Sequence, residues 1–247
     1  MAHLAALWRH PIKGHGREPL ESVTLTAGQT MPWDRRWAVA HDAARITGDT
    51  WAPSVNFSRG AKVAALMAIE ARCDESSGKV TLTHPDLAPL TFDPDHEDEA
   101  FLDWIRPVMP PERAQSARIH RVEGRGMTDT DYPSVSVINL ASNADLSEKT
   151  GREVSSQRWR CNLHLDGLEP WAEFDWVGRT LRIGEAEITV HERILRCPAT
   201  TANPETGQRD LDTLEALKTH FGHQDFGVYA EVTRGGRVTL GDAARLI

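Results

Sequence analysis

The sequence predicts a mainly β protein with a few short helices (α+β), in which an N-terminal β module packs on a β-barrel. Many short segments alternate apolar and polar residues, and Gly, Pro, Asp or Asn separates them. Only three segments show the spacing of an amphipathic helix. The 247 residues, of which 40% are hydrophobic and 26% charged, are enough for one large or two small folded domains.

Short strands are predicted wherever β-branched and apolar residues recur at every second position. The segments with this period are 21–28, 35–42, 62–72, 79–84, 117–124, 134–140 and 180–194. Within the last segment, Gly184 and Glu185 predict a tight hairpin turn. The C-terminal segment 226–247 shows the same alternation, with Gly235 and Gly236 as its turn. Strands spaced this closely are typical of a barrel or a sandwich.

Three helices are expected among these strands, over 96–109, 141–151 and 209–223. The first begins with acidic residues, which the helix dipole favours, and stops at Pro107. The second closes at Gly151. The third repeats leucine at three- and four-residue steps and stops at Gly222.

Three prolines in 106–116 interrupt both periodicities and predict a linker. We therefore expect an N-terminal β-barrel module at residues 1–110 and a second domain at residues 111–247.

The formal charge is −8, from 28 basic and 36 acidic side chains, and no basic stripe is present. This balance disfavours binding to nucleic acid. No apolar run reaches the roughly 18–20 residues that cross a bilayer. Because His10, Pro11 and Lys13 interrupt the N-terminal apolar run, no signal peptide or membrane association is expected, and a cytoplasmic location is predicted.

Cys197 is the strongest candidate for a ligand or nucleophile. The chain contains no Walker A motif, nucleophile elbow, HExxH motif or CxxC pair, and its three cysteines are too scattered for a disulfide framework. Cys197 follows a predicted strand, stands beside Arg196 and precedes a polar turn, and this setting favours a thiolate. The alternative is a buried cysteine that only fills the end of a strand.

Basic residues at three further places suit an anionic, planar ligand. Lys13 lies on a glycine-flanked loop, and Arg35 and Arg36 precede a predicted strand, so these residues could hold a phosphate or simply lie on the surface. Arg160 and Asn162 are two positions apart on a predicted strand. Such residues share one face, and an arginine with an amide suits a ligand with carbonyl and NH edges.

The order of these motifs resembles the molybdenum-cofactor sulfurase C-terminal (MOSC) family. The motifs are Pro-Ile-Lys-Gly (11–14), Asp-Arg-Arg-Trp (34–37), Arg-x-Asn (160–162), Leu-Arg-Ile-Gly (181–184), Arg-Cys-x-x-Thr-Thr (196–201) and a closing Val-x-x-Gly-Asp (238–242). The chain is most similar to the branch with an N-terminal β-barrel module, which includes the mitochondrial amidoxime-reducing component. The resemblance covers nearly the whole chain, is strongest over 158–207, and implies a MOSC-type barrel.

The resemblance implies that Cys197 coordinates molybdenum in a pterin cofactor and is the catalytic residue. It further implies a cofactor-binding set in three groups. Lys13 and Arg35, or the adjacent Arg36, would bind the phosphate of the cofactor. Arg160, Asn162 and Ser134 would bind the pterin, and Arg196 and Thr200 would line the site.

Two positions depart from the family pattern. Gly14 stands where relatives often have serine, which removes a hydroxyl but leaves an amide for the phosphate. Cys161 stands where relatives often have proline. Because it alternates with Arg160 and Asn162 on the predicted strand, we expect its side chain to lie in the core.

The function implied is a molybdenum-dependent reductase that converts amidoximes, hydroxylamines or N-hydroxylated bases to amines. The chain has no iron–sulfur, haem or flavin motif and ends soon after the closing Gly-Asp segment, so a separate ferredoxin, flavodoxin or cytochrome is expected to supply electrons. One alternative is a sulfur-carrier or cofactor-handling domain that uses a persulfide on Cys197. Another is an interaction barrel that binds no metal.

Overall fold

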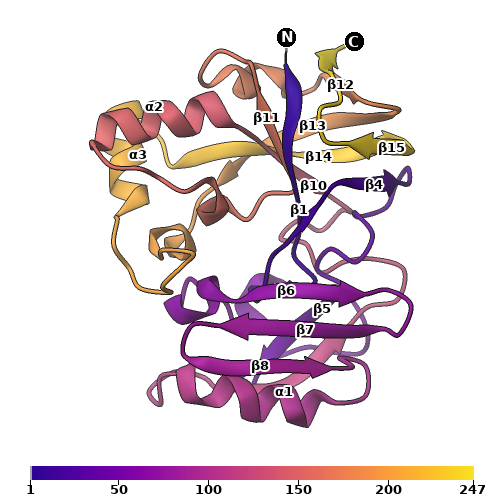
Figure 1. Ribbon diagram of the computed structural model, residues 1–247, viewed down its shortest axis with the longest axis vertical. Coiled ribbons are helices and arrows are strands. Elements are labelled where there is room, and N and C mark those ends of the chain that lie inside the picture. The colour runs from indigo at the N-terminus through magenta and orange to yellow at the C-terminus, as the bar shows by residue number, and fades with distance from the viewer. Residues whose placement is uncertain (1) are drawn as a thin grey trace.

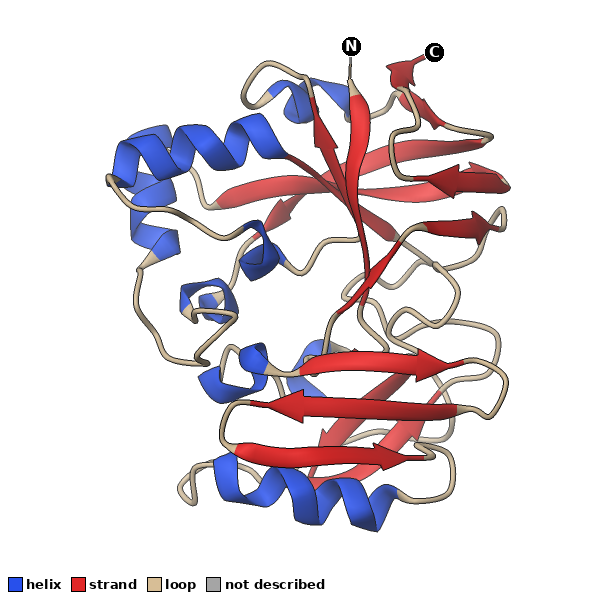
Figure 2. Cartoon of the chain, viewed as in Figure 1, coloured by secondary structure: helices blue, strands red, loops and turns tan. Residues whose placement is uncertain are grey.

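The computed structural model describes residues 2–247, which form mostly strands with three α-helices and several short 3-10 turns (Figures 1 and 2). The three predicted helices are confirmed as α1 (Asp98–Ile105), α2 (Leu140–Thr150) and α3 (Thr213–Phe221). The ends of α2 and α3 follow the predicted signals, because Gly151 and Gly222 both adopt positive φ angles there. The α+β class is therefore confirmed.

An eight-stranded, curled sheet forms the upper half of Figure 1 in the order β16-β12-β13-β14-β10-β11-β1-β3. Its strands are β1 (His3–Arg9), β3 (Glu18–Leu20), β10 (Val135–Asn139), β11 (Leu163–Asp166), β12 (Thr180–Ile183), β13 (Ala186–Leu195), β14 (Asp225–Arg234) and β16 (Ala244–Leu246). All pairs are antiparallel except β10 with β11. Its strands share one buried apolar cluster, which includes Leu4, Val137, Ile188 and Val228.

Two three-stranded sheets form the lower half of Figure 1. One contains β2 (Ile12–Lys13), β5 (Trp37–His41) and β9 (Ser116–Arg121), and the other contains β6 (Glu70–Asp74), β7 (Lys79–His84) and β8 (Leu87–Phe92). Helix α1 lies against β8 and β9 and buries Phe101, whose ring is 5.5 Å from that of Phe92. A separate core of apolar side chains therefore stabilises this part of the chain.

Two of the alternating segments do not form the strands that were predicted for them. Within 62–72, residues Ala64–Ala68 form a 3-10 turn, and only Glu70–Asp74 is a strand. The C-terminal hairpin at Gly235 and Gly236 does not form, because β15 (Gly236–Thr239) pairs with β4 (Ser22–Leu25) near the other end of the chain. The turn at Gly184 and Glu185 is confirmed, since β12 and β13 pair across it.

Strand pairing crosses the predicted division after residue 110 in both directions. Strand β1 comes from the N-terminal segment but pairs with β11 in the eight-stranded sheet. Strand β9 follows the predicted linker but pairs with β5. Strand β3 also belongs to the eight-stranded sheet, and β4 pairs with β15. The boundary at residue 110 therefore stays a prediction. Within residues 2–247, no helix has the length and apolar composition needed to cross a membrane.

Candidate functional site

A cavity of about 630 Å³ lies where the two halves of the chain meet, and both halves line it. Seven of its lining side chains are cationic: Lys13, Arg35, Arg59, Arg158, Arg160, Arg193 and Arg196. Three are carboxylates: Asp129, Asp131 and Glu192. A cationic cavity in a chain of net charge −8 concentrates anions at this one place.

Lys13 lies on the short strand β2 and is buried. Its Nζ donates to the carbonyl oxygen of Met127 at 2.8 Å and to the Asp129 carboxylate. Burial lowers the pKa of Lys13, and Asp129 partly opposes that shift. The buried ring of His15 also bonds the Lys13 carbonyl through Nδ1 at 2.8 Å, which holds the loop beside the cavity.

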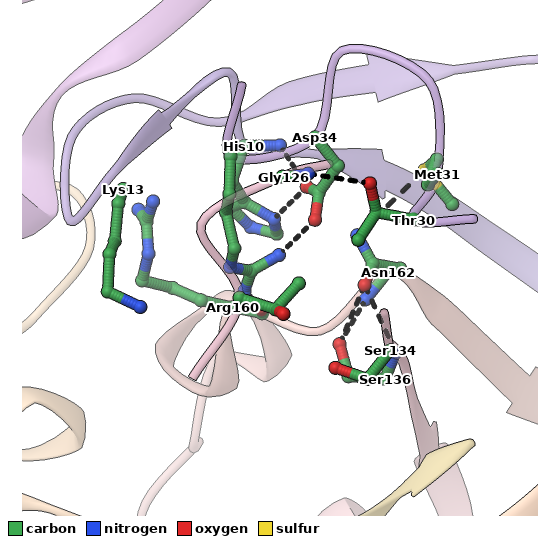
Figure 3. A network of polar contacts seen from close by, with 12 residues as sticks. His10, Lys13, Thr30, Met31, Asp34, Gly126, Ser134, Ser136, Arg160 and Asn162 are labelled. Carbon is green, nitrogen blue, oxygen red and sulfur yellow. Dashed lines mark hydrogen bonds and ion pairs between the residues drawn. The ribbon is translucent and has the colours of Figure 1, made fainter. Parts of the chain in front are cut away.

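Arg35 lies in the turn before β5 with a positive φ of 49°, and it lines the cavity. The fully buried Asp34 pairs with its guanidinium and also accepts the backbone N–H of His10 at 2.8 Å, as Figure 3 shows for His10 and Asp34. Burial is the largest single influence and favours the neutral acid, but the charge of Arg35 and the hydrogen bonds and charge of His10 together outweigh it and lower the pKa of Asp34. Asp34 is therefore an anion that positions Arg35.

Arg160 also enters the cavity from a residue with positive φ, 50°. Its Nη2 donates to the Gly16 carbonyl at 2.9 Å, while its buried Nη1 has no partner among the described residues. Burial and the nearby Arg35 lower the pKa of Arg160 to about 9. A buried, unpartnered guanidinium nitrogen in a cationic cavity is a donor suited to an anionic ligand.

The prediction that residues 158–162 form a strand is wrong, and the predicted common face of Arg160 and Asn162 is wrong with it. Ser156–Trp159 form a 3-10 turn, and β11 starts only at Leu163. Asn162 is not one of the residues that line the cavity, and its Oδ1 accepts the hydroxyl of Ser136, which does line it, at 2.8 Å (Figure 3). Cys161 is buried, as expected, but it lines the cavity rather than lying behind it.

Cys197 follows the end of β13 and is exposed at the cavity. Its carbonyl accepts the amide of Thr200 at 3.2 Å and the Thr200 hydroxyl at 3.1 Å, which closes a tight turn after the thiol. Arg196 also borders the cavity, but carbonyl oxygens occupy its guanidinium, including those of Phe226 at 2.8 Å and Trp159 at 2.9 Å. Arg196 therefore contributes charge while it anchors the strand end.

Two of the other predicted residues lie outside the cavity lining. Arg36 stacks on the rings of Trp33 and Trp37, at 4.5 and 5.2 Å from their centroids. Ser134 is buried and bonds the Thr130 hydroxyl at 2.7 Å. Of the nine predicted residues, the structure brings six together in one cavity: Lys13, Arg35, Arg160, Arg196, Cys197 and Thr200.

Sequence reasoning missed several lining residues. Arg59 comes from a region without a distinctive motif, whereas Arg158 lies two positions before Arg160 in a segment already marked as basic. Arg158 is buried, bonds Asp210 at 2.7 Å and donates to the carbonyl of Thr201 at 3.3 Å. Tyr229 also lines the cavity, and burial together with Asp129 raises its pKa, so its hydroxyl keeps its proton at neutral pH.

Comparison with known families agrees with this architecture. The MOSC N-terminal beta barrel domain matches residues 1–104, and the MOSC domain matches residues 127–245. The chain is therefore a MOSC protein that carries the N-terminal β-barrel domain. This finding confirms the resemblance inferred from the motifs.

Similar curated proteins fall into two named groups. The human mitochondrial amidoxime-reducing component 1 is 28% identical over 58% of this chain and 45% of its own length, and the rat mitochondrial amidoxime reducing component 2 is 32% identical over 45% and 37%. A Culex quinquefasciatus protein named molybdenum cofactor sulfurase 2 is 33% identical over 34% of this chain and 11% of its own length. The matches thus span less than half of these relatives.

Solved structures give weaker likenesses. The YUAD protein from Bacillus subtilis aligns over 100% of this chain and 96% of its own, with 10% identity and a TM-score of 0.45. YiiM from Geobacillus stearothermophilus aligns over 46% of this chain and 53% of its own, with 20% identity and a TM-score of 0.36.

Proposed function

We propose that this protein is a molybdenum-cofactor-dependent oxidoreductase that reduces N-hydroxylated compounds, such as amidoximes and hydroxylamines, to the corresponding amidines and amines. The observation that carries the proposal is the meeting of the exposed Cys197 thiol with seven cationic side chains in one cavity. The curated relatives named for amidoxime reduction support the substrate class.

The residues of the cavity fit a phosphorylated pterin that carries molybdenum. The volume of 630 Å³ lies within the range of about 300–1,000 Å³ that small-molecule sites span. Lys13 and Arg35 would bind the phosphate, because both are held by buried partners and face the cavity. The unpartnered Nη1 of Arg160 would donate to the pterin, and the Cys197 thiolate would bind the metal.

In this proposal the bound cofactor supplies the electron transfer that cleaves the N–O bond. The cleavage consumes two electrons and two protons and releases water together with the amidine from an amidoxime or the amine from a hydroxylamine. Thr200 fixes the turn that presents Cys197, and Arg196 anchors the strand before it. Tyr229 contributes a protonated hydroxyl to the cavity wall, where it can donate a hydrogen bond.

The electrons would come from a separate protein of the ferredoxin, flavodoxin or cytochrome type. This part of the proposal rests on the absence of iron–sulfur, haem and flavin motifs in the sequence. Arg36, Ser134 and Asn162 would act indirectly, by supporting the walls of the cavity rather than by touching the cofactor.

The test compares the wild-type protein with Cys197→Ser, both purified from a host that makes the cofactor. We expect near-stoichiometric molybdenum and pterin in the wild type, loss of molybdenum in the variant, and formation of the amidine from an aromatic amidoxime by the wild type with a chemical reductant as electron donor. Wild-type protein that lacks both pterin and metal, or a Cys197→Ser variant with full metal and turnover, would contradict the proposal.

A second candidate function is sulfur transfer or cofactor handling through a persulfide on Cys197. The matches to proteins named molybdenum cofactor sulfurase favour this candidate. It predicts cofactor or cyanide-labile sulfur on the protein without amidoxime reduction. Turnover of the amidoxime by the molybdenum-loaded protein would exclude it as the main activity.

A further inference from the structure

The loop that follows Cys197 docks on the N-terminal module through an arginine outside the predicted cofactor-binding set. Arg209 lies near the end of this loop and donates through Nη2 to the carbonyl oxygens of Gly60 and Ala61, at 3.2 and 3.0 Å. Its Nη1 bonds the Pro198 carbonyl and the Thr201 hydroxyl in the turn beside Cys197. One guanidinium therefore joins the cysteine turn to a segment about 150 positions earlier.

Backbone packing at the same junction supports this connection independently. A methyl group added at Gly207 would lie 2.7 Å from the Cα of Ala65, so the loop backbone rests directly on the N-terminal module. A methyl group at Gly60 would lie 3.4 Å from the Cβ of Ala199, in the cysteine turn. The loop after Cys197 and the N-terminal module therefore approach each other closely at two places beside Arg209, at Gly207 and at Gly60.

The charge of Arg209 has no ion-pair partner among residues 2–247, so its bonds to neutral oxygens define its role. The neighbouring Asp210 pairs instead with Arg158, which comes from the same half of the chain as the cysteine turn. Arg158 therefore anchors the loop within its own domain, whereas Arg209 connects it to the other one. A planar guanidinium with two nitrogens directed at different acceptors suits this bridging position.

We propose that Arg209 is a positioning residue that fixes the Cys197 turn against residues 60–65 of the N-terminal module. Through this contact the N-terminal module helps to set the position of the thiol, in addition to lining the cavity. The contact fixes the geometry of the turn whatever the protein binds. Only the further consequence, that this geometry matters for binding molybdenum, rests on the proposed function.

Hydrogen exchange of the full-length wild type and Arg209→Ala, measured peptide by peptide with mass spectrometry, tests the coupling. The amides of Thr200 and Ala202, and those of Lys62 and Val63, make only local turn bonds. We expect peptides covering both 57–63 and 197–203 to exchange at least about threefold faster in Arg209→Ala, because local opening becomes easier. Peptides covering β12 and β13 should be unchanged.

Matched variants separate bridging from a general loss of stability. Arg245→Ala removes an arginine from an exposed position on β16 and should leave both peptides unchanged. Gly207→Ala disturbs the same junction from the backbone side and should accelerate exchange in both peptides. Unchanged exchange at 57–63 in Arg209→Ala would overturn the inference, even if 197–203 became faster, because the loop would then not be coupled to the module.

Molybdenum per chain gives the second measurement, with both proteins purified side by side. We expect Arg209→Ala to hold at most about a third as much metal as the wild type, and Arg209→Lys to hold an intermediate amount. An equal molybdenum content in Arg209→Ala and the wild type would overturn the link between the position of the Cys197 turn and molybdenum binding. A wild type without molybdenum would instead contradict the proposed function, while the exchange result would still decide the positioning role.

Discussion

Asp34 does not line the cavity, but it holds two of the cavity's arginine residues in place. Asp34 is fully buried, pairs with Arg35 and accepts the amide of His10. Arg35 in turn donates to the Arg160 carbonyl at 2.8 Å, so one carboxylate organises two of the cavity arginines. Removal of this charge would leave a buried guanidinium without its partner.

We expect Asp34→Asn to lower the free energy of unfolding at pH 7 by about 3 kcal/mol, the cost of breaking a buried ion pair. Because Arg35 lowers the pKa of Asp34 below its usual 3.8 despite burial, this stabilisation is present above pH 4 and is lost as pH falls further. Urea unfolding of the wild type and Asp34→Asn at pH 7 and pH 3.5 measures the difference in unfolding free energy. The exposed Asp175→Asn is the control, and an equal effect of both variants at pH 7 would contradict the prediction.

The sequence identified the residues of the site that belong to a distinctive local pattern. Lys13, Arg35 and Cys197 lie in the short motifs that carry the family resemblance, and all three line the cavity. Arg59 was missed because it lies in a region without a distinctive motif. Arg209 was missed because no local pattern marks its bonds to the distant carbonyl groups of Gly60 and Ala61. Asn162 was misplaced because a 3-10 turn precedes it and β11 begins only at Leu163.

At the scale of elements, turns decide where strands can pair. Gly184 begins the β12–β13 turn with a φ of 55°, and an added methyl group would lie 2.2 Å from the Asp242 carboxylate and 2.9 Å from the Arg237 carbonyl. Gly78, in the turn between β6 and β7, has a φ of 78° and no atom within 4 Å of such a methyl group. The two glycines therefore differ in steric surroundings but share the same backbone requirement.

We expect Gly78→Ala to cost about 1 kcal/mol of unfolding free energy, from backbone strain alone, and Gly184→Ala to cost at least about 2 kcal/mol. Equilibrium unfolding in urea measures both changes, and far-ultraviolet circular dichroism checks that the strands persist. Equal costs for the two variants would show that the contact with Asp242 yields without penalty.

At the scale of the whole molecule, buried histidines connect stability to pH. Burial lowers the pKa of His10 to about 3 and those of His15 and His164 to about 4. All three lie below the usual 6.5, so the unfolded chain binds more protons than the folded one as pH falls through 6.5. Stability is therefore full above that value and decreases below it. Glu173 acts in the opposite direction, because burial raises its pKa.

We expect the free energy of unfolding to fall between pH 7 and pH 5, with each buried histidine contributing up to roughly 2 kcal/mol. Urea unfolding at several pH values tests this slope. His15→Gln, which retains a side chain able to bond the Lys13 carbonyl, should make the slope shallower. The exposed His220→Gln serves as control, and a flat profile in the wild type would contradict the prediction.

The sequence by itself determined the α+β class, the three helices, the β12–β13 turn and the family motifs, because each depends on residues within a few positions of one another. Only the tertiary structure decided that β15 pairs with β4, that β1 joins the larger sheet, and that Arg209 bridges the two halves. These arrangements depend on which distant surfaces bury one another and which carbonyl groups need donors. Periodicity determines what a segment can form, whereas its partners are selected by packing and hydrogen bonding across the whole chain.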